Sequence, residues 1–141
     1  MSHFTTTGQP YTIPALKTWS AGPHGCTFGT HSRLVLLTAQ LAETGAVFAE
    51  DLKLLTGLAI PLVHNASAQA GDIVLTLRPT DAELGEQGYQ LEVSAHVTIS
   101  ANSATGVFYG TRTLLQLLAQ DFTLNGGVAR DWPDYPQRSL M

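Results

Sequence analysis

The sequence predicts an α/β sandwich, an α+β domain in which one mixed β-sheet carries two helices on one face. Two stretches, residues 42–56 and about 104–119, repeat apolar residues every three or four positions, as helices that cover a sheet do. Short apolar or alternating stretches lie around them and are typical of strands. With 141 residues, 44 % of them apolar, the chain can form one domain without disulfides or metal.

The first quarter of the chain predicts a leader and short strands. Residues 1–10 are polar and Thr-rich, and we expect a flexible leader there. An edge strand interrupted by Pro14 follows over residues 11–19, and residues 20–25 form a turn. Residues 26–30 predict a short strand, and residues 33–38 a strand that is buried on both faces.

The first helix is predicted over residues 42–56. Gly57 follows it and can end a helix in the left-handed conformation. The stripe expected to face the core is Leu41, Gly45, Phe48, Leu52 and Leu55.

The second half predicts strands at residues 59–64 and 72–78 and a hairpin of residues 89–93 and 97–100. Asn102 or Ser103 can cap the second helix. Its expected apolar stripe is Val107, Phe108, Leu114, Leu115 and Leu118. Residues 120–141 contain several glycines and prolines and predict an extended connector.

Composition excludes several classes of protein. The net charge of −4 argues against a nucleic-acid partner. No run of 18 apolar residues occurs, so we expect no membrane partner. The chain starts without a signal peptide, which indicates a cytoplasmic protein or a trimmed form of a secreted one.

Metal and cofactor sites are not expected. His24, Cys26 and His31 lie close in sequence and could in principle take zinc, but the glycines between them make that segment a flexible turn. The zinc-protease motif His-Glu-x-x-His is missing, and so are the nucleotide-binding glycine motifs. His64 and His96 lie in or beside strands and are interpreted as structural residues.

The acidic residues do not indicate a catalytic acid–base pair either. Glu50 and Asp51 are expected on the solvated side of the first helix. Five further acidic residues fall in a loop or in the tail, the latter beside Trp132 and Tyr135; they are Asp81, Glu83, Glu86, Asp131 and Asp134. The residues alone therefore predict a non-catalytic domain.

Three segments of the second half resemble a known family. They are Leu84-Gly85-Glu86-Gln87-Gly88-Tyr89-Gln90-Leu91-Glu92-Val93, then residues 97–101, then Gly106-x-Phe108-Tyr109-Gly110-x-x-Thr113-Leu114-Leu115-Gln116-Leu117. Together they resemble the N-terminal accessory domain of family 20 glycoside hydrolases, the β-N-acetylhexosaminidases and chitobiases. The tail, Asp131-x-Pro133-x-Tyr135-x-x-Arg138, is similar to the entry into the family's catalytic barrel. The family pattern has Glu-Gly-Tyr where this chain has Gln87-Gly88-Tyr89.

The resemblance implies a zincin-like fold without the metal site. It implies that the catalytic Asp–Glu pair belongs to a barrel after this chain, where the substrate's acetamido group assists the reaction. No catalytic residue matches here; Arg138 alone matches a substrate-binding position, and only with the barrel attached. The expected organisation is a leader at 1–10, the domain at 11–127 and a connector at 128–141. Gly106 and Gly110 share one helix face and are expected to let the second helix approach the sheet.

The sequence thus predicts an inactive accessory domain that packs against and stabilises the barrel of the same polypeptide, which acts on N-acetylhexosamine-containing glycans. The alternative is a free-standing carbohydrate-binding or protein-interaction module that uses Trp19, Trp132 or Tyr135 for stacking. An uncovered barrel-facing surface would let the isolated domain self-associate.

Overall fold

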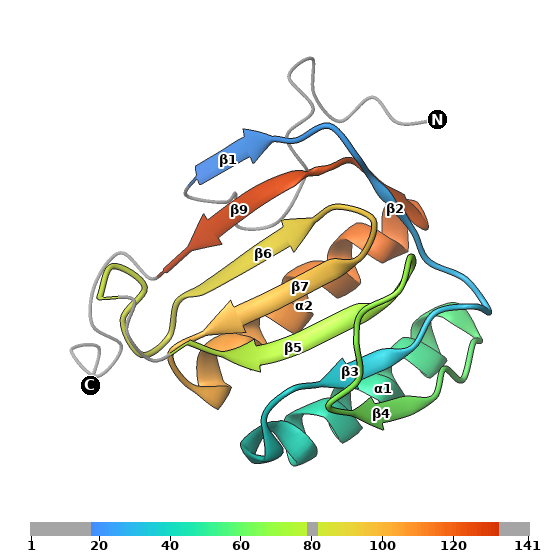
Figure 1. Cartoon of the computed structure of the whole chain (residues 1–141), viewed down its shortest axis with the longest axis horizontal. Coiled ribbons are helices and arrows are strands. Elements are labelled where there is room, and N and C mark those ends of the chain that lie inside the picture. Colours follow the sequence, from blue (N-terminus) through green and yellow to red (C-terminus); the bar gives the residue numbers. More distant parts are fainter. Residues whose placement is uncertain (1–17, 79–81, 133–141) are drawn as a thin grey trace.

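The computed structural model describes residues 18–78 and 82–132. A seven-stranded mixed sheet dominates this part of the chain, with the order β1-β9-β6-β7-β5-β3-β4 (Figure 1). A smaller two-stranded sheet pairs β2 with β8. The strands are β1 (Thr18–Ala21), β2 (Cys26–Thr27), β3 (Leu34–Leu36), β4 (Leu62–His64), β5 (Ile73–Leu77), β6 (Tyr89–Val93), β7 (Val97–Ala101), β8 (Thr123–Leu124) and β9 (Gly127–Asp131).

Both helices lie on the same face of the large sheet, behind it in Figure 1. They are α1 (Ala42–Thr56), which follows a 3₁₀ turn, η1 (Ala39–Leu41), and α2 (Ala104–Gln120). Gly57 ends α1 with a φ of 79°, and the Ser103 hydroxyl caps α2 by accepting a hydrogen bond from the Gly106 amide. The predicted mixed sheet with two helices on one face is confirmed.

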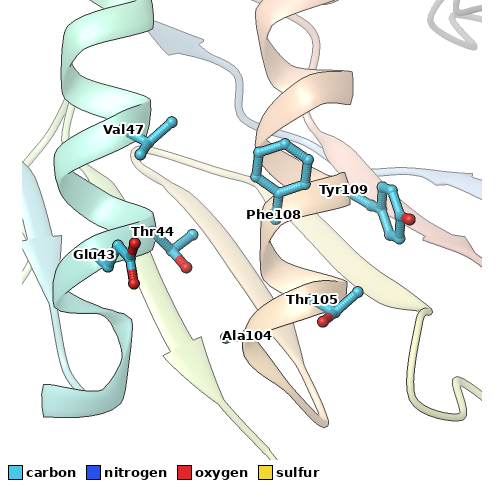
Figure 2. A pocket seen from close by; sticks show the side chains of 7 residues that line it. All are labelled: Glu43, Thr44, Val47, Ala104, Thr105, Phe108 and Tyr109. Carbon is cyan, nitrogen blue, oxygen red and sulfur yellow. The ribbon is translucent and has the colours of Figure 1, made fainter.

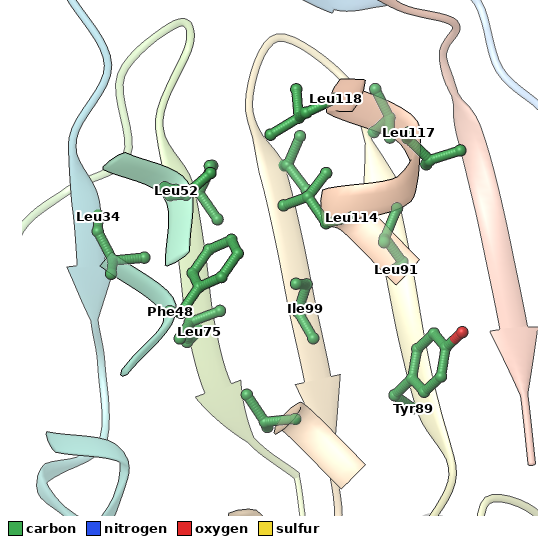
Figure 3. Packing of buried hydrophobic residues seen from close by; sticks show 14 of the residues in the cluster. Leu34, Phe48, Leu52, Leu75, Tyr89, Leu91, Ile99, Leu114, Leu117 and Leu118 are labelled. Atoms are coloured by element: carbon green, nitrogen blue, oxygen red, sulfur yellow. The ribbon is translucent and has the colours of Figure 1, made fainter. Parts of the chain in front are cut away.

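The core lies between the helices and the sheet (Figure 3). Phe48 and Leu52 of α1 and Leu114 and Leu118 of α2 are buried there. They meet the inward-facing side chains of the strands, which include Leu34, Leu36, Leu75, Leu91 and Ile99. Because alternate strand residues face opposite sides of a sheet, these positions repeat with a period of two.

Gly106 and Gly110 bring α2 close to the sheet, as predicted. A Cβ atom added to Gly106 would overlap the Gly88 carbonyl oxygen and approach the Ala101 Cβ to 2.7 Å. One added to Gly110 would lie 2.5 Å from a methyl group of Ile99. The missing side chains are therefore what permits this distance between helix and sheet.

Two predictions about the ends of the domain are wrong. The connector expected from residue 120 onward instead contains β8 and β9, and β9 pairs with β1 on one side and β6 on the other. The expected boundary at residue 128 therefore cuts through a strand of the sheet. The turn expected at residues 20–25 is shortened by β1, which continues to Ala21. The leader at 1–10 and the segment 133–141 lie outside the described residues.

The other strands fall where the sequence predicts them. The hairpin of β6 and β7 is confirmed, and β3 is buried on both faces. No helix in the described ranges is long and apolar enough to cross a membrane.

A short strap crosses the sheet on the face opposite the helices. β4 and β5 both run parallel to β3 and flank it, so residues 65–72 pass over β3 (Figure 1). Parallel crossovers usually need a dozen or more residues and contain a helix. Here the Arg33 side chain secures a shorter connection: its Nη2 donates to the Ser67 carbonyl at 2.8 Å and to the Asp72 carboxylate at 2.6 Å.

Candidate functional site

The outward side of the helix layer carries exposed apolar side chains. Val47 and Leu54 of α1 are 44 % and 76 % exposed, and Phe108 and Tyr109 of α2 are 36 % and 40 % exposed. We call the surface formed by Val47, Asp51, Leu54, Phe108, Tyr109 and Arg112 the outer helix face.

An open groove of about 300 Å³ lies on this face, between the N-terminal halves of α1 and α2 (Figure 2). Val47 and Phe108 point toward each other across it. Its lining consists of Glu43, Thr44, Val47, Ala104, Thr105, Phe108 and Tyr109. The groove is apolar at its centre and carries hydroxyl groups and one carboxylate at its rim.

An ion pair bridges the two helices next to the groove. Arg112 Nη2 lies 2.8 Å from Asp51 Oδ2, and the guanidinium carbon lies 4.6 Å from the centroid of the Phe108 ring. The charge therefore interacts with both a carboxylate and an aromatic ring. The two opposite charges offset each other, which leaves a nearly neutral surface at this point.

Phe108 and Leu55 were both predicted to lie on core-facing apolar stripes, and both predictions are wrong. Successive residues of an α-helix are about 100° apart, so Phe108 is about 200° from Gly106 around α2 and cannot face the sheet with it. The glycine motif therefore contained the signal for an outward Phe108. Leu55, expected in the core, is 43 % exposed at the end of α1.

Glu50 and Asp51 were both expected on the solvated side of α1, and for Asp51 this is wrong. Glu50 is exposed as predicted, whereas Asp51 turns to α2 and pairs with Arg112. Periodicity on one helix could not reveal this, because the partner lies on the other helix. Among the loop acids, Glu83 pairs with Arg130 at 2.9 Å, and Asp81 lies outside the described residues.

A buried hydroxyl network lies at the opposite side of α2. Tyr89 Oη is 2.5 Å from Thr113 Oγ1 and donates to Asp131 Oδ2 at 3.4 Å. Burial, together with the nearby Asp131 charge, raises the pKa of Tyr89 far above its ordinary value of 10.0, so the hydroxyl remains protonated. The network joins β6, α2 and the end of β9.

The candidate residues considered for metal binding differ in their burial. Cys26 is buried in β2, and this burial raises the pKa of its thiol. His24 and His31 are exposed, and the His31 ring packs against Gly71. Across residues 18–78 and 82–132, no group of three or more His, Cys, Asp or Glu side chains could hold a metal ion.

The structure describes two of the three aromatic residues proposed for sugar stacking. Trp19 is half-buried in β1, and its six-membered ring lies so close to Gly127 that a Cβ there would overlap it. Trp132 is also half-buried. Tyr135, Asp134 and Arg138 lie outside the described residues.

Comparison with known proteins defines the class. The family model for glycosyl hydrolase family 20, domain 2, matches residues 9–132. The chain is 35 % identical over 133 residues to the lacto-N-biosidase of Bifidobacterium bifidum, an alignment that covers 92 % of this chain and 12 % of that protein.

Solved structures agree with this match. An N-acetyl-β-hexosaminidase from Streptomyces plicatus superposes with a TM-score of 0.74 and 26 % identity, over 93 % of this chain and 27 % of that one. A family 20 β-N-acetylhexosaminidase from Streptomyces coelicolor A3(2) gives a TM-score of 0.68 and 26 % identity, over 86 % of this chain and 26 % of that one.

The chain therefore belongs to glycosyl hydrolase family 20 and corresponds to its domain 2. The sequence motifs indicated the same family, and this prediction is confirmed. The chain spans about a quarter of the length of the two solved relatives and a smaller part of the lacto-N-biosidase.

Proposed function

We propose that this chain is the non-catalytic accessory domain of a β-N-acetylhexosaminidase, and that it packs against and stabilises the catalytic barrel of the same polypeptide. The family match supports this role, and so does the much greater length of its relatives. The sequence holds no acid–base pair, so the catalytic carboxylates are assigned to the barrel. The layered α+β architecture is consistent with a zincin-like domain that lacks His-Glu-x-x-His.

The outer helix face is the surface we assign to the barrel. Its apolar side chains stay partly exposed in the domain, and this includes Phe108, although the Phe108 ring contacts Arg112 and Tyr109. Interfaces between domains of one chain typically bury about 600–1,500 Å² and combine an apolar centre with a polar rim. The groove and the Asp51–Arg112 pair provide both features on one surface.

Substrate contact is assigned to the tail. Arg138 matches the family's arginine that binds sugar hydroxyls at the start of the barrel, and the planar guanidinium suits paired hydroxyl acceptors. The substrates of the whole protein are accordingly proposed to be glycans that end in N-acetylhexosamine.

The decisive experiment compares two equally exposed residues in the full-length polypeptide. Val47 lies on the outer helix face and Leu37 follows β3, outside the helix layer; both are 44 % exposed. We expect Val47→Asp to lower the melting temperature of the barrel. We also expect it to shorten the half-life of the enzyme's activity, measured as hydrolysis of a chromogenic N-acetylglucosaminide. Leu37→Asp should leave both unchanged, because its side chain does not meet the barrel.

Three results would contradict the proposal. One is an equal effect of the two variants on the barrel, which would place the interface elsewhere. Another is a barrel expressed without this domain that keeps the full stability and activity. The third is turnover by the domain alone, in a preparation free of host hexosaminidase.

A further inference from the structure

Acidic side chains accompany the apolar residues of the outer helix face along α1. Glu43, Val47, Glu50 and Leu54 follow one another there at intervals of four, three and four residues. Since successive residues of a helix are about 100° apart, all of them lie within about 60° of Val47 and form one stripe on the outward side of α1. Both glutamates are exposed. Acidic and apolar side chains therefore alternate along this stripe.

The acidic side chains of the stripe lack cationic partners. No ion pair between two residues of the described ranges includes Glu43 or Glu50. The charged side chain of α2, Arg112, is already paired with Asp51 at 2.8 Å. Lys53, the cation of α1, lies about 120° around the helix from the middle of the stripe. The outward side of the helix layer therefore retains a negative charge.

The groove offers a place for a cationic side chain. Glu43 lines it together with Val47 and Phe108, and Figure 2 shows the Glu43 carboxylate on the α1 side, beside Thr44. Lysine and arginine lay an apolar stem along hydrophobic surface and keep the charged end in a polar environment. Val47 and Phe108 provide the hydrophobic surface for such a stem. The Glu43 carboxylate provides the acceptor for its charged end.

Effects within the domain account for only part of this pattern. Glu43 lies in the first turn of α1, where the positive end of the helix dipole stabilises a carboxylate. Glu50 lies about two turns further along, where that effect has faded. A second copy of the chain would bring an equally acidic face against this one, which makes it the poorer partner. The charge therefore favours a partner surface of opposite sign.

We propose that the outer helix face binds a basic surface of the catalytic barrel, and that Glu43 receives a lysine or arginine side chain of the barrel in the groove. The inference rests on the proposed function, which assigns this face to the barrel. It adds the chemistry of the partner surface: an apolar centre against Val47, with cations opposite Glu43 and Glu50. Complementary charges at an interface act mainly on the choice and orientation of the partner, so the acidic stripe orients the domain on the barrel.

The test measures how fast a thiol at position 47 reacts with iodoacetamide in the full-length polypeptide. Leu37→Cys is the matched reference for Val47→Cys, because both native side chains are 44 % exposed and only Val47 lies on the outer helix face. Cys26 is buried and should react slowly, and mass spectrometry identifies the labelled peptide. Each rate is divided by the rate of the same variant in the 141-residue chain at low concentration, where no barrel is present.

We expect the barrel to slow the labelling of Val47→Cys but not that of Leu37→Cys. Adding Glu43→Gln and Glu50→Gln to Val47→Cys should raise its normalised rate about threefold to tenfold, because the interface opens more often without these ion pairs. Glu92→Gln, which removes an exposed carboxylate of β6 instead, should leave the rate unchanged. Raising the NaCl concentration from about 0.05 M to about 0.5 M should act like the two glutamate substitutions, because salt screens exposed charges.

The outcomes distinguish a failure of this inference from a failure of the proposed function. If Val47→Cys is protected, but neither the glutamate substitutions nor salt speeds its labelling, the basic partner surface is overturned and the accessory role stands. Slower labelling after the glutamate substitutions would overturn it in the same way. Equal normalised rates for Val47→Cys and Leu37→Cys would instead overturn the assignment of this face to the barrel, and this inference with it.

Discussion

The Arg33 guanidinium binds the Asp72 carboxylate through two nitrogens, with Nε 3.1 Å and Nη2 2.6 Å from Oδ2. Asp72 also accepts hydrogen bonds from the backbone amides of Arg33 at 3.0 Å and Gln69 at 2.8 Å. Asp72 is completely buried. These contacts attach the strap of residues 65–72 to the start of β3 and allow a short parallel crossover.

Loss of the Asp72 carboxylate should weaken the whole domain. Asp72→Ala leaves two amides and the guanidinium without their acceptor, and we expect a loss on the order of 3 kcal/mol in the free energy of unfolding. Urea unfolding of the 141-residue chain measures it. Glu92→Ala, an exposed position on β6, serves as the control and should change stability by less than about 0.5 kcal/mol. A loss of that small size for Asp72→Ala would show that the strap holds without this pair.

The same pair should make the domain sensitive to acid. Burial alone would raise the pKa of Asp72, but the hydrogen bonds from Arg33 and Gln69 outweigh it and hold the pKa below its ordinary value of 3.8. The stabilisation is therefore fully present above about pH 5 and is lost as the pH falls through the depressed folded-state pKa. Unfolding at pH 7, 5, 4 and 3 should show that the difference between the native chain and Asp72→Asn shrinks on acidification. A difference that grows toward low pH would contradict this sign.

Two helical glycines should respond differently to alanine. Gly106→Ala would drive a methyl group into the Gly88 backbone, which cannot move without disturbing β6. Gly45→Ala would meet only the Leu36 side chain, its two methyl carbons at 2.9 Å and its Cγ at 3.3 Å, and a side chain shifts more readily than the backbone does. Both changes gain similar helix propensity. We expect Gly106→Ala to destabilise by about 1–3 kcal/mol and Gly45→Ala by clearly less. Thermal unfolding compares them, and the reverse order would refute the close approach of α2.

The isolated domain should self-associate through the outer helix face. An apolar surface on a chain with few charges favours contact between copies. Light scattering over a concentration series should show a rising mass for the native chain and for Leu37→Asp. Val47→Asp should remain a monomer, because a carboxylate in the contact would lose its hydration. A native chain that stays monomeric at high concentration would count against this surface.

Much of the local structure could be predicted because local sequence specifies it. The repeat of Phe48 and Leu52 located α1, and Gly57 marked its end. The alternation in residues 89–101 located the hairpin. Strand β9 was missed because its burial depends on two neighbouring strands, one of them more than 100 residues earlier in the chain. Short strands with mixed polarity carry little signal of their own.

The features of the candidate site also fall into those set by local sequence and those set by contacts between distant elements. The sequence by itself determined the family, the two helices, the mixed sheet and the glycines that bring α2 to the sheet, because periodicity and small residues act over a few positions. Only the tertiary structure decided that Asp51 pairs with Arg112, that Arg33 holds Asp72, and that Tyr89 meets Asp131. Each of these contacts joins residues from separate elements, so none exists until the helices and strands have packed together.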